Sequence, residues 1–220
     1  APLPLRAADG FHAERPADTQ RRGQAEATVP EAVRHDLGLV AERWALGLSS
    51  IVLGAWAFTL ARFTGEDDVV FGAVRSGRGA SSSDAQRLVG CLINTLPVRV
   101  TLDGSASAAQ WLANLRQREH EVRPFDASAL MDVQRWGRAA GHPRAGHDLF
   151  DTLVVYDHAS LNAQMHQGPW ASMWRDRDGS TTVASSTPAA ARRHFRLIEQ
   201  TPYPVTLYAW GEARLPARLA

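Results

Sequence analysis

The residues that are able to do chemistry are few and widely spaced. The chain has a single cysteine, Cys91, and eight histidines. Cys91 lies at the edge of an apolar run, which favours a buried structural thiol over a reactive one. No histidine pair has the His-x-x-x-His spacing of a helical zinc site, and one cysteine cannot complete such a site. We therefore expect no metal centre and no cysteine nucleophile.

The serine and glycine patterns do not fit a nucleophile elbow or a phosphate-binding loop. Ser76 has Val74 two residues before it, where the G-x-S-x-G elbow needs a glycine. Gly77 and Gly79 do not continue into G-x-G-x-x-G, because a serine stands where the third glycine belongs. We expect residues 75–86 to be a flexible polar loop.

One histidine has a spacing that resembles a catalytic motif. His147 and Asp151 form His-x-x-x-Asp, and acyltransferases that use coenzyme A or carrier proteins have a His-His-x-x-x-Asp-Gly loop. Here glycine precedes the histidine and threonine follows the aspartate. The pattern also runs directly into an apolar strand, so we do not expect His147 to be catalytic, and we assign no catalytic residue to this chain.

Charge and composition exclude several classes of function. The basic residues number 24 and the acidic residues 23, which leaves no electrostatic footprint for nucleic acid or an anionic membrane. Every basic residue is arginine, which indicates a GC-rich genome such as that of a high-GC bacterium. No run approaches the roughly 18 apolar residues of a membrane span. The first residues do not form a signal peptide, and we expect a cytoplasmic location.

Apolar periodicity and stop signals predict interleaved strands and helices, hence an α/β or α+β class. The helix over 51–62 is apolar nearly all round, so we expect it to be buried on most sides, capped by Ser49 or Ser50 and closed by Gly65. Further helices are expected over 30–45, 107–122, where Ser107 and Gln110 form a capping box, and 128–136. Strands are expected over 24–29, 68–72, 95–102, 149–156 and 203–210, with 181–185 a further candidate.

Three stretches, in this order, resemble the condensation domain of nonribosomal peptide synthetases. Residues 55–72 end in Asp-Asp-Val-Val-Phe-Gly and are followed by Ser-Gly-Arg. Val89–Arg99 is similar to the family motif I-G-x-F-x-N-T-x-x-x-R, and Leu149–Tyr156 is similar to the strand L-F-D-T-L-V-V-F-E-N. Shorter matches are His120 with Pro124-Phe125 and the pair Tyr203-Pro204. The resemblance covers roughly residues 24–210.

The resemblance implies a lobe of the chloramphenicol acetyltransferase type, an α+β sandwich with a mixed central sheet packed by helices. In the family, this is the second of two lobes. The first carries the His-His-x-x-x-Asp-Gly loop, which nothing in this sequence matches. We expect residues 1–23 to be the inter-lobe linker and 24–220 to be the C-terminal lobe, truncated at its C-terminal end.

The resemblance also implies an activity for the complete domain. One carrier protein presents an acyl thioester, a second presents an amine, and an amide forms between them in a tunnel. This lobe would supply one wall, and alone it would be inactive. The implied partners are the N-terminal lobe, the carrier proteins and an adenylation domain. No cofactor is expected to bind directly, because the substrates travel on the phosphopantetheine of the carriers.

By motif, the candidates for the tunnel wall are Asn94, Arg78 and Ser76. Asn94 would bind a substrate carbonyl or hold the facing loop, or it would only satisfy backbone groups before its strand. Arg78 would meet a carboxylate or a phosphate, or form a structural ion pair. The motif residues expected to be structural are Gly90, Thr95, Arg99, Phe150 and Asp151. Asp157 and His158 stand where relatives have Glu-Asn, so any role of that pair is in doubt.

Two other hypotheses remain at this point. The chain would belong to a degenerate condensation-like module that recruits partners without chemistry, or it would be an independent acyltransferase. The second is poorly supported, because no base loop is visible. An upstream His-His-x-x-x-Asp-Gly motif, intact or degraded, discriminates the active domain from the interaction module.

Overall fold

The computed structural model describes residues 23, 25–77, 89–141, 149–157, 201–211 and 216–219. The elements are β1 (Ala25–Thr28), α1 (Glu31–Arg43), α2 (Leu48–Thr64), β2 (Asp68–Arg75), β3 (Asn94–Thr101), α3 (Ala108–Val122), the 3-10 turn η1 (Arg123–Phe125), α4 (Leu130–Ala139), β4 (Thr152–Asp157), β5 (Val205–Trp210) and β6 (Pro216–Leu219). The candidate strand 181–185, Arg78 and His147 lie outside the described residues.

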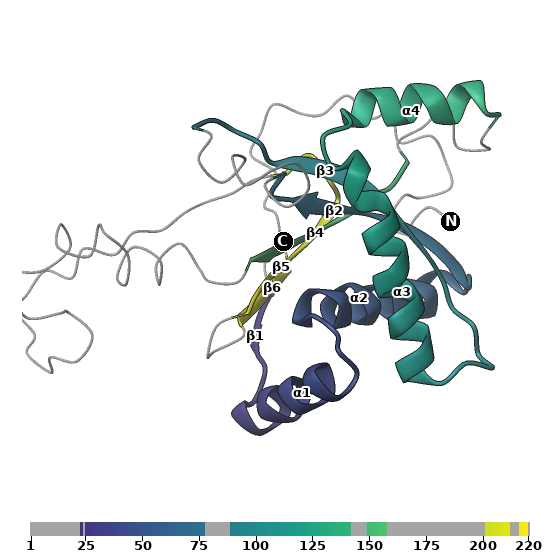
Figure 1. Ribbon diagram of the computed structural model, residues 1–220. Coiled ribbons are helices and arrows are strands. Elements are labelled where there is room, and N and C mark those ends of the chain that lie inside the picture. The colour runs from purple at the N-terminus through teal and green to yellow at the C-terminus, as the bar shows by residue number, and fades with distance from the viewer. Residues whose placement is uncertain are drawn as a thin grey trace, which may run out of the picture.

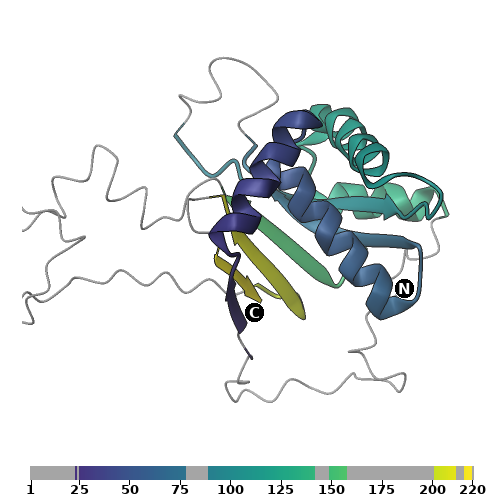
Figure 2. The ribbon, with the colours of Figure 1, turned by 90° about the horizontal axis from the view of Figure 1, so that it is seen from below.

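The strands form one six-stranded sheet in the order β1-β6-β5-β4-β2-β3. Strand β4 pairs in parallel with both β2 and β5, and the other pairs are antiparallel. This confirms the expected mixed sheet. Helices α1 and α2 lie on one face, α3 packs beside α2, and α4 lies over the start of β3 (Figures 1 and 2).

The core lies between α2 and the central strands. Ala57 of α2 and Phe71 of β2 are fully buried, and Val154 of β4 is 1% exposed. The Trp56 indole nitrogen donates a hydrogen bond to Thr152 Oγ1 over 3.2 Å, which ties α2 to β4 inside the core. The alternating apolar residues of β3 therefore meet the helix, as their sequence pattern predicts, whereas β2 is an apolar run without alternation and is buried over Phe71–Ala73.

Helix α2 differs from the expectation in two respects. Gly47 precedes its first residue, so Ser49 and Ser50 lie inside the helix and do not cap it. Ser50 instead donates its hydroxyl hydrogen to Glu119. The helix is also less enclosed than expected, because Phe58 is 55% and Phe63 72% exposed.

Other end signals are confirmed, one of them in part. Gly65 ends α2 with a φ of 72°, the left-handed conformation that glycine adopts at little cost. Ser107 Oγ accepts a hydrogen bond from the Gln110 backbone nitrogen. The Gln110 side chain turns to Asn114 instead of back to the cap, so only half of the capping box forms.

On the opposite face of the sheet, aromatic rings pack against Gly72. A Cβ added at Gly72 would lie 2.3 Å from the Phe150 ring, so a larger residue does not fit in β2 there. Phe150 is 2% exposed, and its ring centroid lies 5.1 Å from that of Tyr203. The family match that ends at Gly72 and the match that contains Phe150 therefore contact each other through the packing of this ring on the glycine.

Among the described residues, no single helix is long and apolar enough to cross a membrane. Helices α1 and α2 reach the required length only together, across a bend of 108°.

Candidate functional site

The parallel pairing of β2, β4 and β5 brings their carboxyl ends to one edge of the sheet, and β3 begins at that same edge. Arg75, the last residue of β2, pairs in register with Asn94, the first residue of β3. Ser76 follows immediately, so two of the predicted tunnel residues lie together. We call the buried and partly buried polar side chains at this edge, Ser50, Arg75, Asn94, Glu119 and Asp126, the polar cluster.

The described residues at the two ends of the β2–β3 connection approach each other closely. Gly77 has a φ of 66°, and a Cβ there would lie 2.0 Å from the Leu92 carbonyl oxygen. Only glycine fits this close approach. Gly90, another motif residue, lies on the returning side with a φ of 152°. Cys91 is exposed on that side, which corrects the expectation of a buried thiol. The apolar run that follows it is only partly covered, since Ile93 is 65% exposed.

Asn94 clamps the turn between η1 and α4. Its Nδ2 group donates to the carbonyl oxygens of Asp126, over 2.9 Å, and Ser128, over 2.6 Å. Its Oδ1 accepts a hydrogen bond from the Thr95 backbone nitrogen over 2.9 Å. Both amide hydrogens are thereby used, because a carboxamide has only two N–H donors. In this arrangement Asn94 acts on its surroundings by holding the turn.

Glu119 of α3 joins the sheet to α2. Its Oε1 accepts a hydrogen bond from Arg75 Nη1 over 3.1 Å, and its Oε2 accepts one from Ser50 Oγ over 2.7 Å. The Glu119 side chain is 10% exposed and that of Arg75 is 20% exposed. Ser50 is 4% exposed. A serine so enclosed, whose acceptor is already paired with arginine, is not arranged as a nucleophile.

Asp126 completes the polar cluster with an unpaired group. It is 9% exposed, and its Oδ1 atom is buried without a hydrogen-bond partner. Burial raises the pKa of this carboxyl above its ordinary value, while the nearby charges of Arg75 and Arg123 act in the opposite direction. Arg75 Nε is likewise buried without a partner. The cluster thus holds two carboxyl groups and one arginine that faces both.

Sequence reasoning predicted Asn94 and missed the rest of this cluster. A usable signal existed for Glu119, because Leu112, Leu115 and Glu119 recur at i, i+3 and i+7, the spacing of one helix face. A carboxylate on an apolar face indicates a buried partner. No such signal marks Arg75, which we expected in the polar loop 75–86 and which is instead the last residue of β2.

The remaining motif residues lie away from the polar cluster. Arg99 forms a two-pronged ion pair with Asp68 at the other end of β2 and β3. Asp151 is buried just before β4, next to Phe150. The motif residues therefore fall into two groups. One group lies at the carboxyl edge of the sheet, and the other lies at its opposite end.

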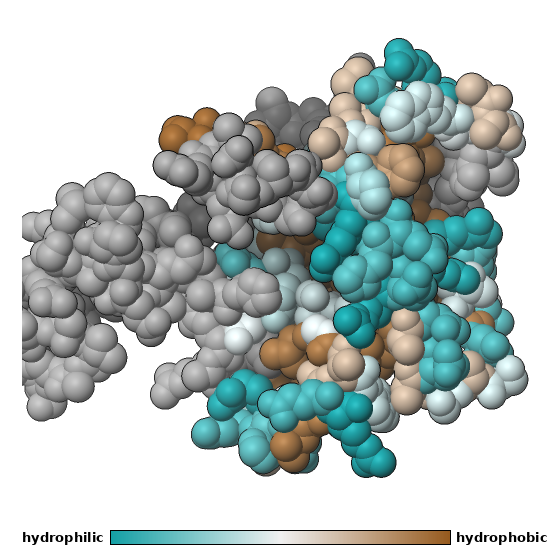
Figure 3. Space-filling view, in the orientation of Figure 1, coloured by the Kyte–Doolittle hydropathy of each residue, from teal (hydrophilic) through white to brown (hydrophobic). Residues whose placement is uncertain are grey.

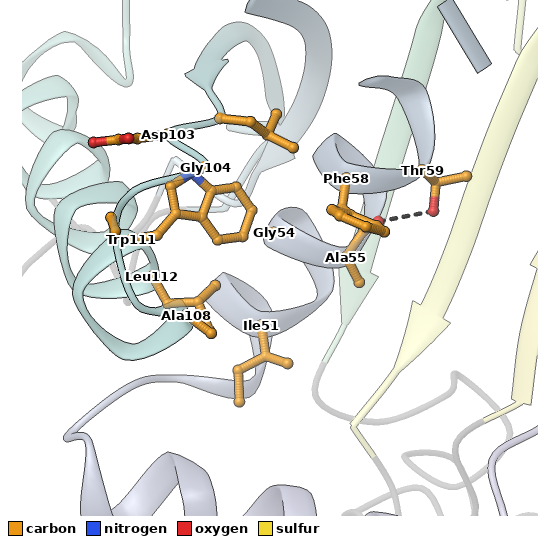
Figure 4. Close-up of a pocket in the computed structure, with 12 residues that line it drawn as sticks. Ile51, Gly54, Ala55, Phe58, Thr59, Asp103, Gly104, Ala108, Trp111 and Leu112 are labelled. Carbon is orange, nitrogen blue, oxygen red and sulfur yellow. Dashed lines mark hydrogen bonds between the residues drawn. The ribbon is translucent and has the colours of Figure 1, made fainter. Parts of the chain in front are cut away.

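An apolar groove lies between α2, α3 and the turn that connects β3 to α3 (Figure 4). Its volume is about 560 Å³, and its lining is mostly apolar. Phe58, Trp111 and Leu112 line it, and the Trp111 indole already donates to the Thr101 carbonyl oxygen. Hydrophobic side chains gather over α2 beside the hydrophilic outer surface of α3 (Figure 3). This apolar groove contains no pair of nucleophile and base.

Among the residues that the structure describes, no three His, Cys, Asp or Glu side chains form a group that could hold a metal ion. The side chains of the polar cluster offer hydrogen bonds and fixed charges.

Comparison with known proteins identifies the family. The model of the condensation domain matches residues 1–212. A linear gramicidin synthase polypeptide of Brevibacillus parabrevis is 33% identical over 192 residues, which is 86% of this chain and 4% of that protein. The chain thus spans a small fraction of this curated relative.

Solved structures show the same fold. A four-domain nonribosomal peptide synthetase bound to AMP and glycine matches 90% of this chain and 14% of that chain, with a TM-score of 0.66 and 14% identity. The first condensation domain of the CDA synthetase matches 90% of this chain and 39% of that chain, with a TM-score of 0.60 and 17% identity. The match confirms the resemblance stated from the motifs, and the chain belongs to the condensation-domain family.

Proposed function

We propose that this chain is the C-terminal lobe of a condensation domain in a nonribosomal peptide synthetase, with residues 1–23 as its linker from the first lobe. The observation that supports the proposal is the share of a condensation-domain chain that this chain covers. The family model matches 1–212, yet the chain spans 39% of a solved condensation-domain chain of the same fold. The remainder of such a domain supplies the other lobe and the His-His-x-x-x-Asp-Gly loop.

In the complete domain, the reaction is aminolysis of a thioester. The amine nitrogen of the acceptor attacks the carbonyl carbon of the donor, a C–N bond forms, the C–S bond breaks and the donor's carrier thiol is released. The amine loses a proton to a base of the first lobe. Holding both tethered substrates face to face makes the encounter nearly unimolecular.

This chain contributes one wall of the substrate tunnel. The polar cluster lies at the carboxyl edge of the sheet, where Ser76 and Asn94 adjoin the segment that contains Arg78. We expect Asn94 to shape the wall through the turn that it holds. The substrates are presented on phosphopantetheine by carrier proteins, beside an adenylation domain, in the cytoplasm. The product is expected to be a secondary metabolite of the antibiotic type.

The test compares this chain with the complete domain that contains it. Both are incubated with a donor carrier bearing an acyl thioester and an acceptor carrier bearing an aminoacyl thioester, and amide product is measured by mass spectrometry. We expect the complete domain to form amide and this chain to stay at the uncatalysed rate.

Turnover by this chain alone, abolished by His147→Ala, would show that His147 is a base and that the proposal is wrong. An inactive complete domain that still binds both carriers would instead indicate an interaction module.

A further inference from the structure

We infer that Arg75 and Glu119 are positioning residues for the condensation reaction, because their ion pair fixes the end of β2 and the start of β3, where Ser76, Gly77 and Asn94 lie. This inference rests on the proposed function. Neither residue belongs to the family motifs at 76–78 and 89–99.

The Arg75–Glu119 ion pair adjoins residues that are predicted to form the tunnel wall. Arg75 pairs in register with Asn94, and Asn94 holds the turn at 126–128. The next two residues, Ser76 and Gly77, begin the segment that returns at Leu92. A shift of the Arg75 backbone therefore moves the base of the segment and the Asn94 clamp together.

Glu119 determines where Arg75 can lie. Both of its carboxylate oxygens are occupied, one by Arg75 and one by Ser50, and these partners come from the sheet and from α2. Charge-assisted hydrogen bonds are roughly twice as strong as neutral ones. Glu119 thus registers the end of β2 against two helices, through side chains that are mostly buried.

The same strands provide a matched control. Arg99 and Asp68 also pair an arginine with a carboxylate across β2 and β3, but at the opposite end, with side chains 65% and 45% exposed. If any arginine–carboxylate pair on these strands served equally, both pairs would affect the reaction alike. The positioning role requires that only the buried pair does.

The decisive variant removes the polar partners together, since taking one away leaves an unpaired buried charge. In the complete domain, we would make the triple variant Ser50→Ala/Arg75→Met/Glu119→Met and the control double variant Asp68→Asn/Arg99→Met. Replacing a buried ion pair by apolar groups of similar size is often neutral for stability, so the triple variant is expected to fold. Its Tm should fall below that of the wild type only by what the Asp126 carboxyl loses with the Arg75 charge.

Two measurements then test positioning. In single turnover with both carriers loaded, we expect the triple variant to form amide at least about tenfold more slowly, with KM for the carriers nearly unchanged, because small misplacements cost rate steeply. Hydrogen exchange should become faster at residues 75–77, 92–95 and 126–128. The control variant should match the wild type in both.

A triple variant with a single-turnover rate within twofold of the wild type would overturn the inference, whatever its exchange. So would an equal loss of rate in the control. If the wild-type complete domain forms no amide, the proposed function fails, and hydrogen exchange alone decides here. Faster hydrogen exchange of the triple variant, confined to residues 75–77, 92–95 and 126–128, would then support the role of the Arg75–Glu119 ion pair in holding these stretches. Unchanged exchange would overturn it.

Discussion

The two ends of the β2–β3 pair carry similar ion pairs in different surroundings. Arg99 and Asp68 approach closely, with Nη2 and Oδ2 2.6 Å apart, but both side chains are largely in water. Arg75 and Glu119 lie 3.1 Å apart and are mostly buried. Desolvation, more than distance, determines what each pair does. An exposed pair is screened and adds little stability, whereas a buried one makes each partner depend on the other.

The largest effect is expected from removing only the arginine of the buried pair. Arg75→Met leaves the Glu119 carboxylate buried without its cation, which typically costs about 3–5 kcal/mol. For a chain of this size, each kcal/mol lowers Tm by roughly 2–4 °C. Thermal unfolding of the variant should show a fall of roughly 10 °C. Arg99→Met is the control, and an equal, small loss from both substitutions would contradict the distinction between the two ends.

A smaller effect is expected from Asn94→Ala. The substitution leaves the carbonyl oxygens of Asp126 and Ser128 and the Thr95 N–H without the partner they have now. Leaving buried groups unpaired costs about 1–3 kcal/mol, which urea unfolding would measure. Asn114→Ala removes an exposed amide that pairs with Gln110 on the same helix and serves as the control. Equal losses in the two variants would show that the clamp adds nothing.

The third effect depends on pH. Burial raises the pKa of Asp126 above 3.8, so just above that pH the folded chain retains a proton that the unfolded chain releases. Stability contributed by this group therefore falls as pH rises through the window between 3.8 and the raised pKa, and stays low above it.

Asp126→Asn has no carboxyl to ionise. We expect it to be more stable than the wild type at neutral pH, with an advantage that shrinks as the pH falls toward 3.8. Urea unfolding of both proteins across this range measures the difference. An advantage that grows on acidification would reverse the sign and contradict the account of a desolvated carboxyl.

The smallest effect belongs to the exposed pair. A hydrogen bond from Arg99 lowers the pKa of Asp68, so its stabilisation is present above pH 3.8 and is lost as pH falls below it. Because both side chains are exposed, Asp68→Asn should cost less than about 1 kcal/mol, and less still at high salt. A loss as large as that of Arg75→Met, insensitive to salt, would remove the contrast between the ends.

Local sequence signals predicted most of the fold. Apolar runs located β2, β3, β4 and β5. Gly65 marked a helix end because glycine adopts the left-handed conformation at little cost, and Ser107 marked one because its hydroxyl accepts a backbone hydrogen bond. The predicted start of α2 was wrong because Ser50 finds a distant acceptor in Glu119, which no local pattern announces. Strand β6 was missed because its segment is only four residues long and begins with a proline.

The candidate site was less predictable than the fold. Motif resemblance indicated Asn94, but not that its amide binds two carbonyl oxygens more than 30 positions away in sequence. Arg75 and Asp126 acquire their significance from tertiary burial, which turns ordinary surface residue types into members of a polar cluster. Such groups are visible in sequence only when, like Glu119, they interrupt an apolar helix face.

The most direct test of the tunnel wall is the single-turnover rate of Asn94→Ala in the complete domain, expressed per folded molecule and measured well below its Tm. We expect a rate roughly ten- to hundredfold below the wild type, the kinetic equivalent of about 1–3 kcal/mol, with Asn114→Ala unchanged. A normal rate per folded molecule, together with a lowered Tm, would show that Asn94 only braces the fold and would contradict its role in shaping the reaction site.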